Sequence, residues 1–151
     1  HSAAMKISRH PRRTRTALAA LVVAVSLATS ACLSPSQSAV QAELNKDRSE
    51  HSLRTLPIQQ EAQAKAQKWA EKLARENRLY HSELREGFGD GWCSLGENVG
   101  YGPSVPAIED AYMASPGHRA NILASKWTGV GVGYAKNGSR VFTVQVFYRA
   151  C

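Results

Sequence analysis

The segment GENVGYGPSVPAIEDAYMASPGHRANIL (residues 96–123) carries most of the reactive side chains that the sequence brings together. It contains a carboxylate, Glu97, and a histidine, His118, which follows a Ser-Pro-Gly tripeptide. A second histidine, His81, stands upstream beside Ser82. Two imidazoles and one carboxylate from separate segments predict a polar site that is assembled by the fold.

Local sequence signals give an expected structure to this segment. Glycines on both sides of Glu97 indicate a loop. Val105–Ala114 is predicted to be a helix, and Ser115 is predicted to cap the next helix, with Pro116 in its first turn. His118 then lies near the positive end of the helix dipole, which disfavours an imidazolium. The neutral imidazole is the form that binds metals or accepts protons.

The chain before this segment has helical periodicity. Ala39–Ser49 is predicted to be a first helix, and Pro57 is predicted to lie in the first turn of a second. Residues Ile58–Asn77 repeat apolar side chains at three- and four-residue steps. We expect Trp69 and Leu73 to be the main apolar anchors of the buried face of this second helix.

The chain after this segment has the alternation of β-strands. Trp127–Tyr134 and Arg140–Tyr148 are predicted strands, joined by a hairpin turn at Asn137-Gly138. Both alternating sets of the second strand contain apolar residues, so we expect it to be central in its sheet. Helices before strands, with both sheet faces buried, predict a layered α+β domain.

Residues 1–31 have the pattern of an export signal. Met5 is the expected initiator after a remnant, His1–Ala4, and five basic residues precede the apolar run Ala17–Ala31. This pattern predicts a secretory signal peptide that is too short to span a bilayer comfortably. An uncleaved membrane anchor is the alternative.

Cys32 follows Thr29-Ser30-Ala31, which resembles a bacterial lipobox with Thr29 at an unusual position. If the match holds, Cys32 is lipidated, residues 32–37 form a linker (the polar run Leu33–Ser38), and residues 38–151 form the domain. A lipid anchor would tether that domain to the outer face of a membrane. Ordinary cleavage after Ala31 is the alternative.

The net charge of +7 is concentrated in the signal region. Five of the 19 Lys and Arg precede Cys32 and all 12 Asp and Glu follow it, which leaves a net charge of +2 for residues 32–151. That part of the chain has no basic tract interleaved with aromatics. Nucleic acid is therefore excluded as a partner.

Cys93 and Cys151 form an even pair once Cys32 is set aside. Export to an oxidising compartment favours a disulfide between them over two free thiols. The bridge would close a loop of about 58 residues and stabilise the fold by on the order of 4 kcal/mol.

Six motifs occur in an order that resembles a known family. They are Leu44-Asn45 with Arg48, His81-Ser82, Gly96-Glu97-Asn98, the run from Ser115 to Leu123 (SPGHRANIL), Gly129-Val130-Gly131-Val132-Gly133 and Gln145-Val146-Phe147. Over residues 38–150 the chain resembles a bacterial CAP (SCP-like) domain, of the superfamily that includes cysteine-rich secretory proteins, antigen 5 and pathogenesis-related proteins. The resemblance implies a three-layer α-β-α sandwich with a central antiparallel sheet and a large surface cleft.

The resemblance also implies roles for the polar residues. His81 and His118 would be the two cleft histidines, able to hold a divalent cation such as zinc. Glu97 would be the first of two cleft glutamates, with Asn98 beside it. Ser115 occupies the place of the second glutamate, so the tetrad of the family is at most a triad here.

Three functions fit these residues. The first is an exported binding module whose cleft holds a divalent cation and a lipid-like or cell-envelope ligand. The second is a metal-assisted hydrolase of peptides or cell-envelope material, with Glu97 as base. Its candidate nucleophiles are Ser82, Ser115 and Cys93, although a helix cap suits Ser115 better and a disulfide suits Cys93 better. The third is a polar network that only orders the glycine-rich segments. The sequence leaves the natural ligand and the oligomeric state open.

Overall fold

Three antiparallel strands form the centre of the part of the chain described by the computed structural model, residues 32–151. The strands are β1 (Trp92–Gly102), β2 (Gly129–Asn137) and β3 (Arg140–Ala150), in the order β1-β3-β2. The prediction that the last strand is central is confirmed. The predicted signal peptide lies outside the described residues.

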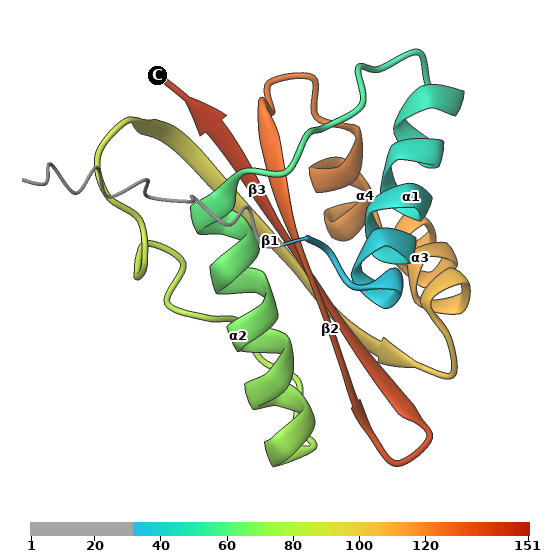
Figure 1. Cartoon of the computed structure of the whole chain (residues 1–151). Helices are drawn as coiled ribbons and strands as arrows, with labels where there is room; N and C mark the ends of the chain where they lie inside the picture. The colour runs from blue at the N-terminus through green and yellow to red at the C-terminus, as the bar shows by residue number, and fades with distance from the viewer. Residues whose placement is uncertain (1–31) are drawn as a thin grey trace, which may run out of the picture. The chain divides into compact units, whose positions relative to one another are not determined.

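Helices cover both faces of this sheet. They are α1 (Pro35–Glu50), α2 (Gln60–Glu76), α3 (Val105–Ala114) and α4 (Pro116–Leu123). Figure 1 shows α2 on one side of the strands and the other three helices on the opposite side. The predicted α+β class and its three layers are confirmed. None of these helices is long and apolar enough to cross a membrane.

The α2 face of the sheet is packed backbone against backbone. A Cβ added at Gly131 would lie 2.0 Å from the backbone of Ala62, and one at Gly133 would lie 2.1 Å from the carbonyl oxygen of Ala66. Both alanines and Ala70 are fully buried. The Gly-Val-Gly-Val-Gly run of β2 therefore lets a helix faced with alanines approach the sheet closely, while its valines fill the opposite face.

Side chains of α2 also cover the edge of β2. Gln63 donates to the carbonyl of Val132 and accepts from its N–H, both at 2.8 Å. Gln67 makes the same pair of bonds with Tyr134, both at 2.9 Å. Two glutamines at i and i+4 thus replace a neighbouring strand, and they block this stretch of the edge from pairing with another chain.

The opposite face combines large apolar side chains with a buried arginine. Its core includes Leu44, Leu56, Ile122, Trp127 and Phe147. Arg48 of α1 is buried among them and donates to the carbonyl oxygens of Arg54, Ile122 and Ala124 at 2.7–2.8 Å. The guanidinium therefore satisfies carbonyls at the end of α4 and fixes α1 against it.

The predicted linker and first helix need correction. Residues Leu33–Ser38 are not a linker throughout, because α1 begins at Pro35. Ser34 caps it in a reciprocal arrangement with Gln37, each side chain accepting from the other's backbone N–H. The proline and serines that resembled a linker are a helix-start signal.

The start and the buried face of α2 also differ from the prediction. The helix begins at Gln60 rather than Pro57, because Pro57 and Gln59 hydrogen-bond with Val130 of β2, each at 3.0 Å. Leu73 is fully buried as predicted. Trp69 is only half-buried and is not a main anchor of the buried face. The buried face is formed instead by the alanines of α2 together with Leu73.

The glycine-flanked segment around Glu97 is a strand, not the predicted loop. A Cβ at Gly100 would lie 2.7 Å from the Tyr112 ring, and one at Gly102 would lie 3.0 Å from the Ile108 side chain. Glycine is therefore required here for close approach of α3 to β1. The periodicity of a strand was hidden because these positions have no side chain.

Candidate functional site

Glu97 is a buried carboxylate that orients a largely exposed histidine. Its Oε1 accepts from His81 Nδ1 at 2.8 Å and from the Ser82 N–H at 3.0 Å. Its Oε2 accepts from Ser82 Oγ at 2.5 Å. The His81 side chain is 64% exposed, whereas that of Glu97 is 3% exposed. The carboxylate therefore engages Nδ1 of His81, and Nε2 is the ring nitrogen that remains for a ligand.

His118 is the third residue of α4, as predicted, and is half-buried. Its ring centroid lies 5.0 Å from that of Tyr112. Burial lowers the pKa of His118 from its ordinary value, and the charge of a protonated His81 lowers it further. The imidazole is therefore held neutral near neutral pH, in the state that has a lone pair to donate.

The three predicted residues come from three different elements. His81 lies in the segment after α2, Glu97 on β1 and His118 on α4. β1 is an edge strand; its Glu97 bonds to the segment that follows α2, and its Asn98 bonds to α4. The structure places His81 and Glu97 in direct contact, and His118 is linked to β1 through the bond from Asn98 to its backbone carbonyl.

Asn98 lies behind these residues rather than lining a cleft. It is fully buried on the opposite face of β1 and donates to the His118 carbonyl at 3.1 Å and to Gln145 Oε1 at 3.0 Å. Its Oδ1 accepts from Asn121 at 3.0 Å. Asn98 therefore holds the first turn of α4, and with it His118, against the sheet.

Glu109 extends this buried network and was not predicted as part of it. Its Oε2 accepts from Gln145 at 2.6 Å, whereas no donor lies within reach of Oε1. Burial raises the pKa of Glu109 to about 8, and the carboxylates of Asp47 and Glu43 on α1 add to that rise. Both causes disfavour a second negative charge here, so the folded chain favours the protonated, neutral form of Glu109. The sequence signal was only its position between the core residues Ile108 and Tyr112.

Ser115 takes the predicted capping position without the predicted bond. It is the N-cap residue of α4 with extended backbone, but its side chain makes no capping hydrogen bond. Its backbone carbonyl accepts from the Arg119 N–H at 2.8 Å. The start of α4 is therefore set by Pro116 and the Ser115 backbone conformation.

The predicted disulfide between Cys93 and Cys151 is present, with Cα atoms 4.9 Å apart. The Cys151 N–H also donates to the Gly91 carbonyl at 2.9 Å. These two links fix the last residue to the start of β1, the strand that carries Glu97. Cys32 is an exposed free thiol in the described residues, and its lipidation stays a prediction.

The donor set around the two histidines is small. Within residues 32–151, no group of three or more His, Cys, Asp or Glu side chains is arranged to hold a metal ion. Glu97 already accepts three hydrogen bonds from His81 and Ser82. The protein therefore offers two imidazoles, and solvent or a ligand would have to complete the coordination of any cation.

Known proteins with the same fold include two bacterial proteins described as extracellular or outer-surface proteins. One is an extracellular SCP-domain protein from Bacillus anthracis, 27% identical, with a TM-score of 0.62 over 80% of this chain and 45% of that one. Another is an outer surface protein from Borrelia burgdorferi, 16% identical, with a TM-score of 0.67 over 74% of this chain and 90% of that one. The second likeness shows the fold alone.

Sequence comparison adds a family and a curated relative. The chain is 34% identical over 104 residues to an uncharacterized protein, YkwD, of Bacillus subtilis. That match covers 63% of this chain and 40% of YkwD, so the chain spans less than half the length of this relative. The family model named CAP, the cysteine-rich secretory protein family, matches residues 41–147. The chain therefore belongs to the CAP family.

Proposed function

We propose that this chain is an exported CAP module that binds a divalent cation between His81 and His118 and does not catalyse a reaction. The observation that carries the proposal is the bond from His81 Nδ1 to the buried carboxylate of Glu97. Export is supported by the predicted signal peptide, by the disulfide, and by the extracellular and outer-surface descriptions of structural neighbours.

The contact between His81 and Glu97 has the form that prepares a histidine for a metal. A carboxylate that accepts from one ring nitrogen fixes the tautomer, orients the ring and raises the basicity of the other nitrogen. Ser82 holds that carboxylate with two further bonds. Glu97 thus acts as the support of a ligand rather than as a ligand.

The chemistry of two neutral imidazoles selects among cations. Imidazole nitrogen suits zinc and related transition metals better than calcium or magnesium, which prefer oxygen. With two protein ligands the site would be weaker than a closed structural zinc site and would keep open positions. These open positions could accept a polar group of a cell-envelope or lipid-like ligand.

The geometry favours binding over hydrolysis. In a Ser-His-Glu arrangement the histidine lies between the nucleophile and the carboxylate. Here Ser82 Oγ donates directly to Glu97, and His81 contacts the same carboxylate from the other side. Cys93 is in a disulfide, and Ser115 makes no side-chain hydrogen bond that marks an activated hydroxyl.

Calorimetric titration of the full chain with zinc tests the proposal. We expect binding heat in the wild type, its loss in His81→Ala/His118→Ala, and its retention in His51→Ala, which removes the exposed histidine at the end of α1. Equal affinity in wild type and double variant would assign the histidines to a purely structural network. Hydrolysis of a peptide or ester library that disappears in Glu97→Ala would instead establish the enzyme.

The membrane anchor has its own test. We propose that Cys32 is lipidated, because the preceding residues resemble a lipobox and the thiol is exposed. Mass spectrometry of the mature N-terminus should then show acyl chains on Cys32. An unmodified terminus would leave simple secretion.

A further inference from the structure

A second candidate binding site lies in a groove between α2 and the segment that follows it. The cavity has a volume of about 410 Å³, within the range of small-molecule sites. Ten residues line it, and we call this surface the basic groove: Glu61, Ala64, Lys65, Lys68, Trp69, Lys72, Arg75, Ser82, Glu86 and Gly87. Neither His81 nor His118 is among them.

The cations of the basic groove follow from helix geometry. Lys65, Lys68, Lys72 and Arg75 are spaced by three and four residues, which places them on one stripe of α2. The lining contains four basic side chains and two acidic ones, a net charge of +2, which equals that of residues 32–151 as a whole. A concave surface with an excess of one sign attracts ligands of the opposite sign.

The charges of the basic groove are not equally available. Lys65 donates to the carbonyls of Glu83 and Glu86, at 2.7 and 2.8 Å, and so holds the facing segment in place. Glu61 is also occupied, because it accepts from the Gly89 N–H at 2.8 Å. No hydrogen bond to protein is present for Lys68 Nζ or Lys72 Nζ among the described residues. These two ammonium groups remain for a ligand.

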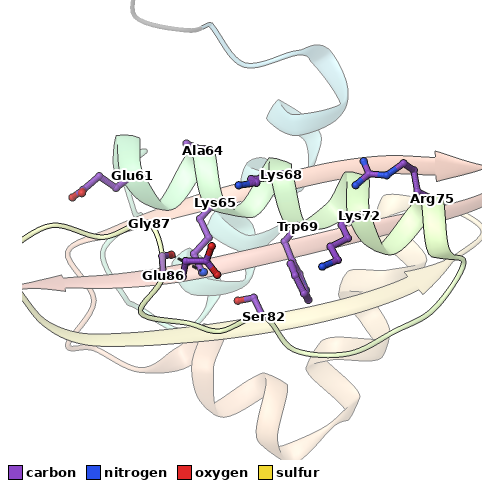
Figure 2. Close-up of a pocket in the computed structure, with 10 residues that line it drawn as sticks. All are labelled: Glu61, Ala64, Lys65, Lys68, Trp69, Lys72, Arg75, Ser82, Glu86 and Gly87. Atoms are coloured by element: carbon purple, nitrogen blue, oxygen red, sulfur yellow. Dashed lines mark hydrogen bonds between the residues drawn. The ribbon is translucent and has the colours of Figure 1, made fainter.

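Trp69 gives the basic groove a fixed aromatic surface. Its indole N–H donates to the Tyr80 carbonyl at 3.0 Å, and its ring packs edge-on against Tyr80 at 4.9 Å. The Lys72 ammonium lies 5.2 Å from the Trp69 ring centroid. Figure 2 shows Trp69 and Lys72 pointing from α2 toward the segment that carries Ser82. Trp69 thus packs partly against the core of the α2 face and also lines the basic groove.

We propose that the basic groove binds an anionic saccharide. The apolar face of a sugar ring packs on an aromatic side chain, and Trp69 offers such a surface at little cost in side-chain freedom. The ammonium groups of Lys68 and Lys72 would donate hydrogen bonds to a carboxylate or phosphate on the sugar. Ser82 Oγ, which already donates to Glu97, would accept from a sugar hydroxyl. A single fixed indole in a cavity of this size suits one short saccharide segment.

This inference does not depend on the cation site. The two sites share Ser82, which lines the basic groove and binds Glu97, but the basic residues of the groove lie on α2. The His81→Ala/His118→Ala variant should therefore bind an anionic saccharide as the wild type does. Failure of zinc binding and failure of saccharide binding are then separate results.

Titration of the full chain with trigalacturonate, followed by tryptophan fluorescence and calorimetry, tests the inference. We expect Lys68→Glu/Lys72→Glu to lower affinity at least tenfold and Trp69→Ala to lower it comparably. The matched control is Lys46→Glu/Lys136→Glu, which changes net charge equally at two exposed lysines outside the groove and should retain affinity. Equal losses in both double variants would overturn the inference, because only long-range attraction would be involved.

Three further ligands test which anionic group, if any, the basic groove requires. Neutral maltotriose should bind at least tenfold more weakly than trigalacturonate, and equal binding would overturn the role of the cations. Glucose 1-phosphate in place of the uronate reports whether phosphate is accepted as well as carboxylate. Binding to phosphatidylglycerol vesicles without binding to any saccharide would overturn the inference in favour of a membrane surface.

Discussion

The two faces of the sheet are held by different physical means. On the α2 face, glycines of β2 meet alanines of α2 with no room for another carbon atom. On the face covered by α1, α3 and α4, large side chains surround buried, hydrogen-bonded polar side chains, among them Arg48, Asn98 and Glu109. Packing on the first face depends on the absence of side-chain volume, and packing on the second depends on hydrogen bonds between buried groups. Different substitutions should therefore destabilise each face.

The largest effect should come from adding one carbon atom to the α2 face. Gly131→Ala places a Cβ 2.0 Å from the backbone of Ala62, which cannot yield as a flexible side chain would. We expect unfolding free energy to fall by at least about 4 kcal/mol, measured by urea denaturation.

A matched glycine controls for that result. Gly117 in α4 has nothing within 4 Å of an added Cβ. Gly117→Ala should therefore stabilise the protein by roughly 0.5–1 kcal/mol, because alanine loses less backbone entropy in a helix. Similar behaviour of the two alanine variants would show that the α2 face is looser than described.

The next effect should come from removing the buried cation on the opposite face. Arg48→Met keeps much of the volume but leaves the carbonyls of Ile122 and Ala124 without their donor. We expect a loss of roughly 3–5 kcal/mol in urea denaturation, because buried acceptors would remain unpaired. Arg149→Met, at an exposed position of β3, should change stability little. A small loss for Arg48→Met would mean that water replaces the guanidinium.

A smaller, pH-dependent effect should come from Glu109. The pKa of Glu109 rises from 4.5 to about 8 on folding, so the folded chain binds a proton that the unfolded chain releases between these values. Stability contributed by this group is present at low pH and is lost as pH rises. Wild type should lose on the order of 3 kcal/mol between pH 5 and pH 8 relative to Glu109→Gln, which cannot ionise. Parallel pH profiles of the two proteins, from urea denaturation at each pH, would contradict a protonated Glu109.

These contrasts explain what could be predicted from the sequence. Amphipathic periodicity and caps located α3, α4 and the central strand, because those signals are local. The strand β1 was missed because its glycines serve contacts with α3 that lie elsewhere in the sequence. The start of α2 was misplaced for the same reason, since Pro57 and Gln59 bond to Val130.

The site shows the same division between local and long-range information. The motifs identified His81, Glu97 and His118, and the structure adds which atoms of the first two meet. Asn98 and Glu109 are connected to each other because both form hydrogen bonds with Gln145 of β3. A sequence pattern does not show which way such side chains point, so their hydrogen-bond partners could not be predicted.

We propose that His81 and His118 form a cation site beside the edge strand β1 and that Glu97 supports it. Diffraction from zinc-soaked crystals at the zinc absorption edge tests it most directly. We expect an anomalous peak bonded to His81 Nε2 and to a ring nitrogen of His118, with Glu97 still bound to His81 Nδ1. A peak elsewhere with none at these histidines, or a peak bonded to Glu97 in place of His118, would contradict it.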